Sequence, residues 1–179
     1  MNIYLIGYRC TGKTSVGRML AKKLDWRFVD TDQYIVEKAG MPVSRIVADR
    51  GWACFRKKEK QALAEINSYE RLVIATGGGI ILDPDNRGLL KDKHNFVVWL
   101  QAGPETITNR MENDAQTEAL RPALTEASLV REIDETLAER IPYYESTADI
   151  TVNTDPLSVI KICDHILEAL RKRCINLTQ

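Results

Sequence analysis

Little in this sequence would support a metal centre, a disulfide framework or a membrane span. Its 179 residues include only two histidines and four cysteines, and the cysteines show no short paired spacing, so neither a zinc site nor a set of disulfides is expected. The longest apolar run, residues 96–100, is far too short to cross a bilayer. The first residues also lack the pattern of a secretory signal peptide. We therefore expect a cytoplasmic protein with free thiols.

The chain also lacks an excess of either charge. Lysine plus arginine equals aspartate plus glutamate, at 25 each, which argues against broad electrostatic binding to nucleic acid or to an anionic membrane. A length of 179 residues suits one compact domain with a proper core. We expect a single domain over residues 1–179, and a monomer.

The most informative motif lies close to the start of the chain. An apolar run at residues 3–6 leads into residues 7–14 (GYRCTGKT), which fit the phosphate-loop spacing G-x-x-x-x-G-K-[ST]. Gly7 and Gly12 let the backbone turn tightly, so that its N–H groups can surround phosphates. Lys13 would reach the terminal phosphates and the Thr14 hydroxyl would ligate Mg²⁺. The segment after Gly12 would open a helix whose dipole faces the anion. The motif predicts a site for nucleotide phosphates.

Short apolar runs alternate with segments of helical periodicity along the chain. The runs lie at residues 3–6, 28–29, 72–75, 96–100 and 150–152. Helices are expected at about residues 13–24, 32–39, 43–50, 53–67, 104–112, 127–145 and 157–173. Continuous runs rich in valine and isoleucine suit strands buried on both faces of a parallel sheet. The alternation predicts a doubly wound α/β domain, and such sheets bind ligands beyond the carboxyl ends of their strands.

Two regions depart from this simple alternation. Residues 32–68 hold two or three expected helices instead of one, and this excess could cover a second substrate. Residues 112–119 are polar and weakly periodic, and they lead into residues 120–122 (LRP). We interpret that stretch as a mobile surface segment and a candidate lid.

Two carboxylates directly follow the second apolar run. Asp30 and Asp32 are two residues apart, so in extended chain they point the same way and could both face the phosphate loop. Asp30 could then hold Mg²⁺, directly or through water, and Asp32 could accept a proton from an acceptor hydroxyl. The alternative is a helix cap, because Thr31 or Asp32 at the start of a helix is common. The residues alone leave both interpretations open.

Three successive glycines, Gly77, Gly78 and Gly79, follow the third apolar run. Close approach of the backbone to a ligand would explain them, and a flexible turn is the alternative. Arg56 lies near the start of one expected helix and Arg140 near the end of another. Either could form a bidentate pair with a carboxylate ligand, or be an ordinary surface charge.

Other charged residues are less distinctive. Arg121, in the candidate lid, could swing onto the phosphates at the transition state. Lys57, Lys58, Glu59 and Lys60 are most simply interpreted as a solvated helix face.

In this combination and order, these residues resemble the shikimate kinase family, over nearly the whole chain. The resemblance rests on residues 7–14, 28–32 (FVDTD), 55–56 (FR), 76–79 (TGGG), 120–122 (LRP) and 140–144 (RIPYY). A phosphate loop alone is weakly specific among kinases, whereas the combination is highly specific. The resemblance implies a three-layer P-loop kinase fold, with a five-stranded parallel sheet in the order 2-3-1-4-5. It also implies an acceptor-binding segment at about residues 32–60 and a lid at about residues 112–125.

The activity implied is Mg²⁺-dependent transfer of the γ-phosphoryl group of ATP to the 3-hydroxyl of shikimate, which gives shikimate 3-phosphate and ADP on the route to chorismate and the aromatic amino acids. By position, Lys13, Asp32 and Arg121 resemble the catalytic residues, while Thr14 and Asp30 serve the metal. The shikimate-binding positions are Asp32, Arg56, Gly77, Gly78, Gly79 and Arg140. The ATP-binding positions are Gly7, Cys10, Thr11, Gly12, Lys13, Thr14, Ser15, Arg110, Arg121 and Asn153.

One residue departs from the family pattern, and other kinases share parts of it. Cys10 stands where the family often has a further glycine, and it is tolerated there if its φ is negative. The nearest alternative function is that of a gluconate or nucleoside-monophosphate kinase of similar fold. A P-loop regulatory switch would be expected to carry an Asn-Lys-x-Asp motif, which the sequence lacks. A catalytically inactive binding module is disfavoured because Asp30, Asp32 and Lys13 are all present.

Overall fold

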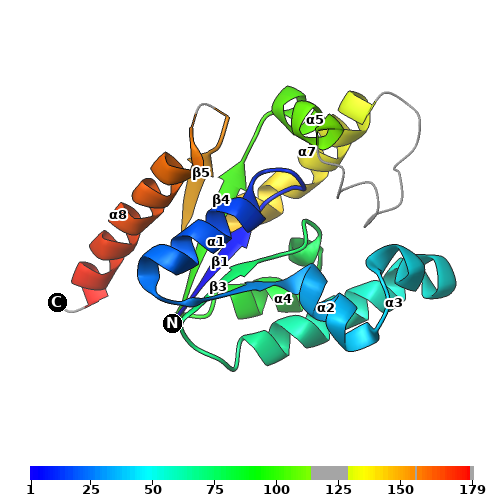
Figure 1. Ribbon diagram of the computed structural model, residues 1–179, viewed down its shortest axis with the longest axis horizontal. Coiled ribbons are helices and arrows are strands. Elements are labelled where there is room, and N and C mark those ends of the chain that lie inside the picture. The colour runs from blue at the N-terminus through cyan, green and yellow to red at the C-terminus, as the bar shows by residue number, and fades with distance from the viewer. Residues whose placement is uncertain (114–128, 156, 178–179) are drawn as a thin grey trace.

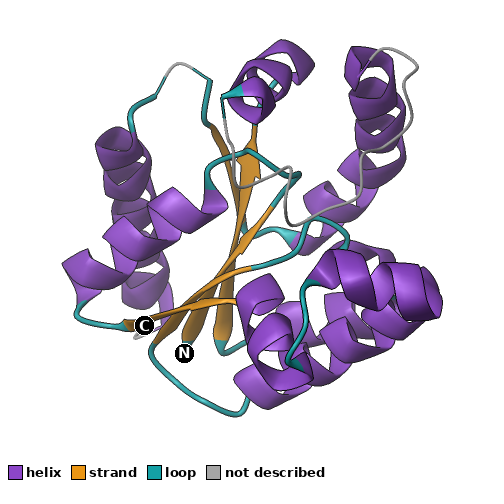
Figure 2. Cartoon of the chain, turned by 45° about the vertical axis from the view of Figure 1, so that its right-hand side comes forward, coloured by secondary structure: helices purple, strands orange, loops and turns teal. Residues whose placement is uncertain are grey.

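The computed structural model describes residues 1–113, 129–155 and 157–177. Five parallel strands form one sheet in the order β2-β3-β1-β4-β5, which Figure 2 shows as a twisted layer between helices. The order and the fold class predicted from the sequence are confirmed. The strands are β1 (Asn2–Ile6), β2 (Arg27–Asp30), β3 (Leu72–Ala75), β4 (Asn95–Gln101) and β5 (Ile150–Asn153).

The central strands are buried on both faces, as their unbroken apolar runs predict. Every residue of β1 and of β3 is buried. Successive side chains of β1 point to opposite faces. Ile3 and Leu5 join a core cluster with α1 (Lys13–Leu24) and α8 (Val159–Leu177). Tyr4 and Ile6 join a second cluster with α3 (Val43–Ile66), α4 (Pro84–Leu90) and α7 (Leu129–Thr147). These two cores make the three layers visible in Figure 1.

The helices otherwise follow the predicted pattern, with two differences. The expected helices at 43–50 and 53–67 form one helix, α3, interrupted at Gly51, whose φ of 75° is left-handed. The 3₁₀ turn η1 (Ile80–Leu82) and helix α4 were not predicted, because elements of three and seven residues are too short to show a helical period. Asp83 caps α4 by accepting from Asp85 N, and Pro84 follows it, which is a local start signal.

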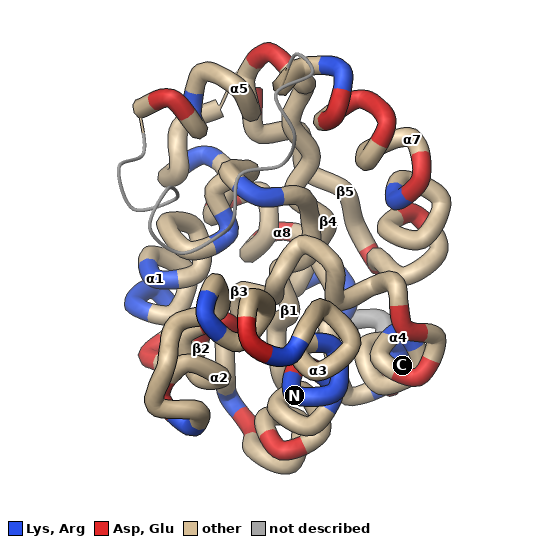
Figure 3. Tube along the Cα trace, turned by 90° about the vertical axis from the view of Figure 1, so that its right-hand side faces the viewer, with Lys and Arg blue, Asp and Glu red and all other residues tan. Residues whose placement is uncertain are grey.

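The excess helices between β2 and β3 are α2 (Thr31–Ala39) and α3. They share a small apolar core of their own, made by Ile35, Val43, Ile46, Phe55 and Ala62. Among the described residues, the remaining helix is α5 (Pro104–Glu112). Of the helices in the described part of the chain, none combines the length and the apolarity that crossing a bilayer requires. Acidic and basic positions are interspersed along the elements seen in Figure 3.

Candidate active site

The loop between β1 and α1 is built for an anion. Gly7 and Gly12 have φ values of 139° and 92°, and a Cβ on Gly7 would lie 2.3 Å from the carbonyl oxygen of Leu100. Helix α1 begins at Lys13, as predicted, and no side chain caps its N-terminus. The first N–H groups of α1 are therefore not occupied by a capping side chain, which is the arrangement that binds phosphate at a helix start.

Side chains of the loop fold back onto its own backbone. The Lys13 Nζ donates to the carbonyl oxygen of Tyr8 at 2.5 Å, and the buried Thr11 hydroxyl donates to the same oxygen at 2.8 Å. Both contacts tie side chains at the end of the loop to the backbone at its start. Thr14 and Ser15 are exposed in the first turn of α1, so their hydroxyls can meet a ligand.

Cys10 has a left-handed backbone, with φ of 58°. The condition under which we expected it to be tolerated, a negative φ, is therefore not met. For an L-residue this conformation is strained, because Cβ approaches the following carbonyl oxygen. The loop imposes on Cys10 a conformation that a glycine would adopt freely. No local sequence pattern indicates that a residue with a Cβ would take this conformation.

Asp30 both caps α2 and contacts the phosphate loop. Its Oδ1 accepts from the backbone N–H groups of Asp32 at 3.0 Å and Gln33 at 3.3 Å, and its Oδ2 accepts from the Thr14 hydroxyl at 3.1 Å. The cap interpretation thus applies to Asp30 and not to Thr31 or Asp32. The Thr31 hydroxyl instead accepts from Gly77 N at 3.0 Å. Burial, and then the neighbouring Asp32 carboxylate, raise the pKa of Asp30.

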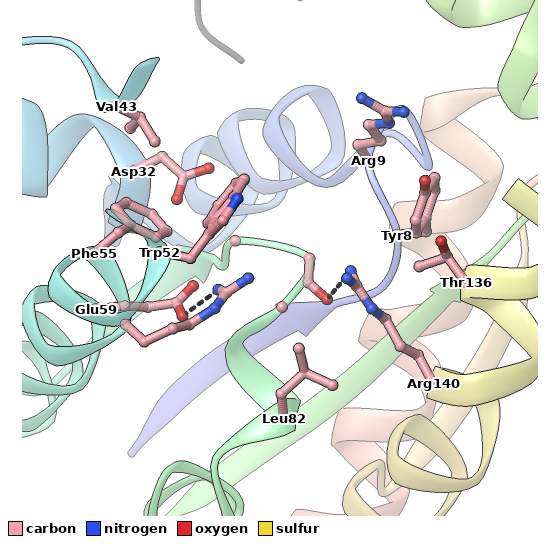
Figure 4. Close-up of a pocket in the computed structure, with 14 residues that line it drawn as sticks. Tyr8, Arg9, Asp32, Val43, Trp52, Phe55, Glu59, Leu82, Thr136 and Arg140 are labelled. Atoms are coloured by element: carbon pink, nitrogen blue, oxygen red, sulfur yellow. Dashed lines mark hydrogen bonds and ion pairs between the residues drawn. The ribbon is translucent and has the colours of Figure 1, made fainter. Parts of the chain in front are cut away.

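A cavity of about 400 Å³ opens beside the phosphate loop. Figure 4 shows residues of α2 and α3 on one side of it and residues of the phosphate loop and α7 on the other. It brings together all six predicted acceptor residues: Asp32, Arg56, Gly77, Gly78, Gly79 and Arg140. The lining residues that were not predicted are Tyr8, Arg9, Val43, Trp52, Phe55, Glu59, Leu82 and Thr136.

The triple glycine lies against the charged groups of this cavity. A Cβ on Gly77 would lie 2.8 Å from Asp32 Oδ1, and one on Gly79 would lie 2.2 Å from Arg56 Nη2. The Gly78 carbonyl accepts from the Tyr144 hydroxyl at 2.5 Å and from Arg140 Nη1 at 3.4 Å. Larger residues at Gly77 or Gly79 would displace these side chains, so these two glycines serve close approach and not only flexibility.

Arg56 is held by a buried carboxylate. Its Nη1 donates to Glu59 Oε2 at 2.6 Å, and Glu59 has no exposed surface. The interpretation of Glu59 as part of a solvated helix face is therefore wrong. Its position relative to Phe55 and Leu63, four residues before and after it, places it on the buried face of α3, and this spacing could have revealed it.

Aromatic rings close the same side of the cavity. Trp52 and Phe55 meet edge to face, with ring centroids 6.0 Å apart, and the Arg56 guanidinium lies 5.5 Å from each centroid. Trp52 keeps 46% of its surface exposed. An exposed indole beside a charged cavity offers an apolar wall to a ring-shaped ligand.

Arg110 joins the loop after β5 to the phosphate loop. It donates to the Cys10 carbonyl at 3.2 Å, and to the hydroxyl and carbonyl of Thr154 at 3.1 and 3.0 Å. Asn153 ends β5, and its Oδ1 accepts from Asp155 N at 2.9 Å. Of these two predicted nucleotide residues, Arg110 therefore contacts the phosphate loop directly. Arg121 and residues 114–125 of the expected lid lie outside the described residues.

The family model described as shikimate kinase matches residues 9–171 of the chain. The chain belongs to the shikimate kinase family. A shikimate kinase of Moorella thermoacetica is 42% identical over 177 residues, which cover 99% of this chain and 98% of the relative. The solved shikimate kinase from Acinetobacter baumannii in complex with shikimate is 33% identical, with a TM-score of 0.89 over 96% of this chain and 93% of that one.

The alternative kinase is more distant from this shikimate kinase family member. A gluconokinase structure from Sinorhizobium meliloti 1021 is 19% identical, with a TM-score of 0.61 over 99% of this chain and 95% of that one. That likeness shows a shared fold alone.

Proposed function

We propose that the protein transfers the γ-phosphoryl group of ATP to the 3-hydroxyl of shikimate, giving shikimate 3-phosphate and ADP for chorismate and aromatic amino-acid synthesis. Membership of the shikimate kinase family supports the reaction. One observation supports the choice of substrate: the Asp32 carboxylate and the guanidinium groups of Arg56 and Arg140 line a single cavity beside the phosphate loop. A small carboxylated polyol needs both kinds of group, because its carboxylate and its reacting hydroxyl must be held at once.

Asp32 is the residue we assign to the acceptor hydroxyl. It would accept the proton of the 3-hydroxyl as that oxygen attacks the γ-phosphorus of ATP. The bond from the γ-phosphorus to the bridging oxygen breaks, and ADP leaves with the electron pair. Lys13, beside the same loop, would place a positive charge on the transferred group. Positioning and charge stabilisation account for most of the rate enhancement in such reactions.

Thr14 and Asp30 fit a magnesium site. A hydroxyl and a carboxylate oxygen, 3.1 Å apart, meet at the mouth of the phosphate loop, and Mg²⁺ prefers oxygen ligands that it shares with substrate phosphates and water. The described residues contain no group of three carboxylate, histidine or cysteine ligands, which is compatible with an ion held largely by the nucleotide. Bound there, Mg²⁺ would neutralise phosphate charge during transfer.

Arg56 and Arg140 are the residues we assign to the shikimate carboxylate. Glu59 fixes the direction of Arg56, and the Gly78 carbonyl meets Arg140. The backbone at Gly78 and Gly79 would approach the ring hydroxyls. Removing one guanidinium should cost roughly 1.5–3 kcal/mol of acceptor binding, the usual strength of a charge-assisted hydrogen bond.

Several assignments stay predictions alongside this function. Residues 32–60 contribute six of the lining residues, namely Asp32, Val43, Trp52, Phe55, Arg56 and Glu59, which supports their assignment as the acceptor-binding segment. Free thiols at Cys10, Cys54 and Cys163 suit a reducing cytoplasm. The single domain, the monomer, the lid with Arg121 and the adenine contacts of Arg110 and Asn153 are expectations from the family resemblance and the chain length.

An ADP-release assay with shikimate, gluconate and AMP as acceptors tests the proposed function. We expect turnover with shikimate, dependent on Mg²⁺, and little with the other two. Strong turnover on gluconate alone would overturn the substrate assignment while leaving the kinase assignment intact.

A further inference from the structure

Arg9 is a third arginine of the acceptor cavity, and the proposed mechanism gives it no task. It comes from the phosphate loop, unlike Arg56 on α3 and Arg140 on α7, and it lines the cavity together with them. Its backbone N lies 3.5 Å from the position a Cβ would take on Gly78. Arg9 therefore stands where the nucleotide loop and the acceptor cavity meet.

Two nitrogens of the half-buried Arg9 side chain are buried without a polar partner. Within the part of the chain that the structure describes, its Nε and Nη2 have less than 1 Å² of exposed surface each and donate no hydrogen bond to a protein acceptor. The contact it does make is with a ring, the Tyr8 side chain, at 5.6 Å from the centroid. Buried charged donors without an acceptor are costly, so an anionic ligand is the partner that would satisfy them.

The anion that would bind Arg9 differs from the one that we assign to Arg140. The Arg140 guanidinium also lies against the Tyr8 ring, 5.8 Å from its centroid, and Figure 4 shows Tyr8 between the two arginines. Glu59 is engaged with Arg56. With the shikimate carboxylate assigned to Arg56 and Arg140, the remaining anionic group that the reaction brings into this cavity is the phosphoryl group itself.

We propose that Arg9 binds the phosphoryl group once it is on the acceptor, and so discriminates shikimate 3-phosphate from shikimate. A planar guanidinium with two N–H groups in one direction matches the oxygens of a phosphate. The proposal rests on the proposed function, because that function supplies the phosphorylated acceptor. It adds a product-binding role to a loop residue that the phosphate-loop pattern leaves unspecified.

Isothermal titration of the whole protein with shikimate 3-phosphate, shikimate and ADP tests this. In Arg9→Gln we expect the affinity for shikimate 3-phosphate to fall about 10- to 100-fold, the loss of one charge-assisted contact. Affinities for shikimate and for ADP should be nearly unchanged, because neither carries the transferred group. Arg140→Gln is the matched control, and it should lower the affinities for shikimate and for shikimate 3-phosphate by the same factor.

The outcomes separate this inference from the function on which it rests. Arg9 has no such role if Arg9→Gln weakens the binding of shikimate and of shikimate 3-phosphate equally. The same holds if the variant weakens the binding of ADP, or leaves the binding of shikimate 3-phosphate unchanged. If the parent protein does not phosphorylate shikimate, the proposed function fails instead. Should Arg9→Gln not fold, as judged by thermal unfolding, Arg9→Lys keeps the charge but loses the planar fork. It should still bind shikimate 3-phosphate more weakly than the parent at unchanged shikimate affinity, and an unchanged product affinity would overturn the proposal.

Discussion

Arg56 and Glu59, one turn apart on α3, form an ion pair in which only the arginine keeps exposed surface. Glu59 is fully buried, whereas the Arg56 side chain keeps 29% of its surface exposed. In the proposed function the carboxylate has a positioning role, because it orients the guanidinium that we assign to the shikimate carboxylate. A buried carboxylate at this place would otherwise only destabilise the fold.

Glu59→Gln should separate positioning from folding. Glutamine keeps the size and one acceptor but removes the charge, so Arg56 loses a charge-assisted partner. We expect the free energy of unfolding to fall by about 1–3 kcal/mol, and KM for shikimate to rise with a smaller effect on KM for ATP. Urea unfolding and steady-state kinetics measure both. A rise in KM for ATP equal to that for shikimate would show that the change is a general disturbance.

Gly79→Ala should displace Arg56 without disrupting the backbone. The new Cβ would lie 2.2 Å from Arg56 Nη2, and the end of a flexible side chain can move away. We expect a large rise in KM for shikimate and a small change in stability. Gly88→Ala, in α4, is the control, because a Cβ there meets nothing within 4 Å. That variant should gain about 0.5–1 kcal/mol of stability with normal kinetics. Normal shikimate KM in Gly79→Ala would contradict the close approach.

Asp32→Asn tests the proposed base. Asparagine keeps the shape of the side chain but cannot take the proton of the acceptor hydroxyl. We expect kcat to fall about 10²- to 10⁴-fold, with ATP binding nearly unchanged because the loss is at the acceptor. Single-turnover rates and nucleotide titration measure the two effects. Near-normal turnover would remove Asp32 from the mechanism.

The sequence predicts those features that local chemistry decides. The phosphate loop, the buried parallel strands and the spacing of Asp30 and Asp32 follow from local patterns, because strands that are buried on both faces and glycine-rich turns have strong local signatures. The strand order is predicted by the family resemblance and not by spacing. Glu59 was misjudged because three lysines surround it in sequence, whereas packing of α3 decides its burial. The φ of Cys10 and the contact of Tyr144 with Gly78 depend on distant segments meeting. No local pattern encodes them.

Cys10 permits a direct test of backbone strain. At ordinary helical or extended positions, alanine is more stable than glycine by about 0.5–1 kcal/mol, whereas a left-handed residue with a Cβ loses about 1–2 kcal/mol. Because Cys10 has φ of 58°, we expect Cys10→Gly to be more stable than Cys10→Ala. Both variants lose the thiol, so its packing cancels in the comparison. Urea unfolding measures the free energy of unfolding of both variants. Greater stability of the alanine variant would exclude the left-handed conformation.

Asp30 gives a test that depends on pH. Burial first, and the Asp32 carboxylate second, raise its pKa in the folded protein. A carboxyl group with a raised folded pKa opposes folding when ionised. This cost is absent below its unfolded pKa of about 4 and complete above the folded pKa. Asp30→Asn removes the charge, and asparagine caps a helix as well as aspartate does. The variant should therefore be more stable than the parent at neutral pH, and this advantage should shrink as the pH falls toward about 4.

Urea unfolding without nucleotide or Mg²⁺, at several pH values across this range, measures the difference. Asp83→Asn is the matched control, because Asp83 is the N-cap of α4 and pairs with Lys60 at 3.6 Å. Removing that charge gives up an attraction, so the control should gain no stability at neutral pH. Since Asp30 also faces Thr14 in the proposed magnesium site, Asp30→Asn should weaken Mg²⁺-dependent ATP binding even as it stabilises the fold. A variant that is less stable than the parent at neutral pH, or whose advantage grows as the pH falls, would show that the Asp30 charge is not disfavoured in the folded protein.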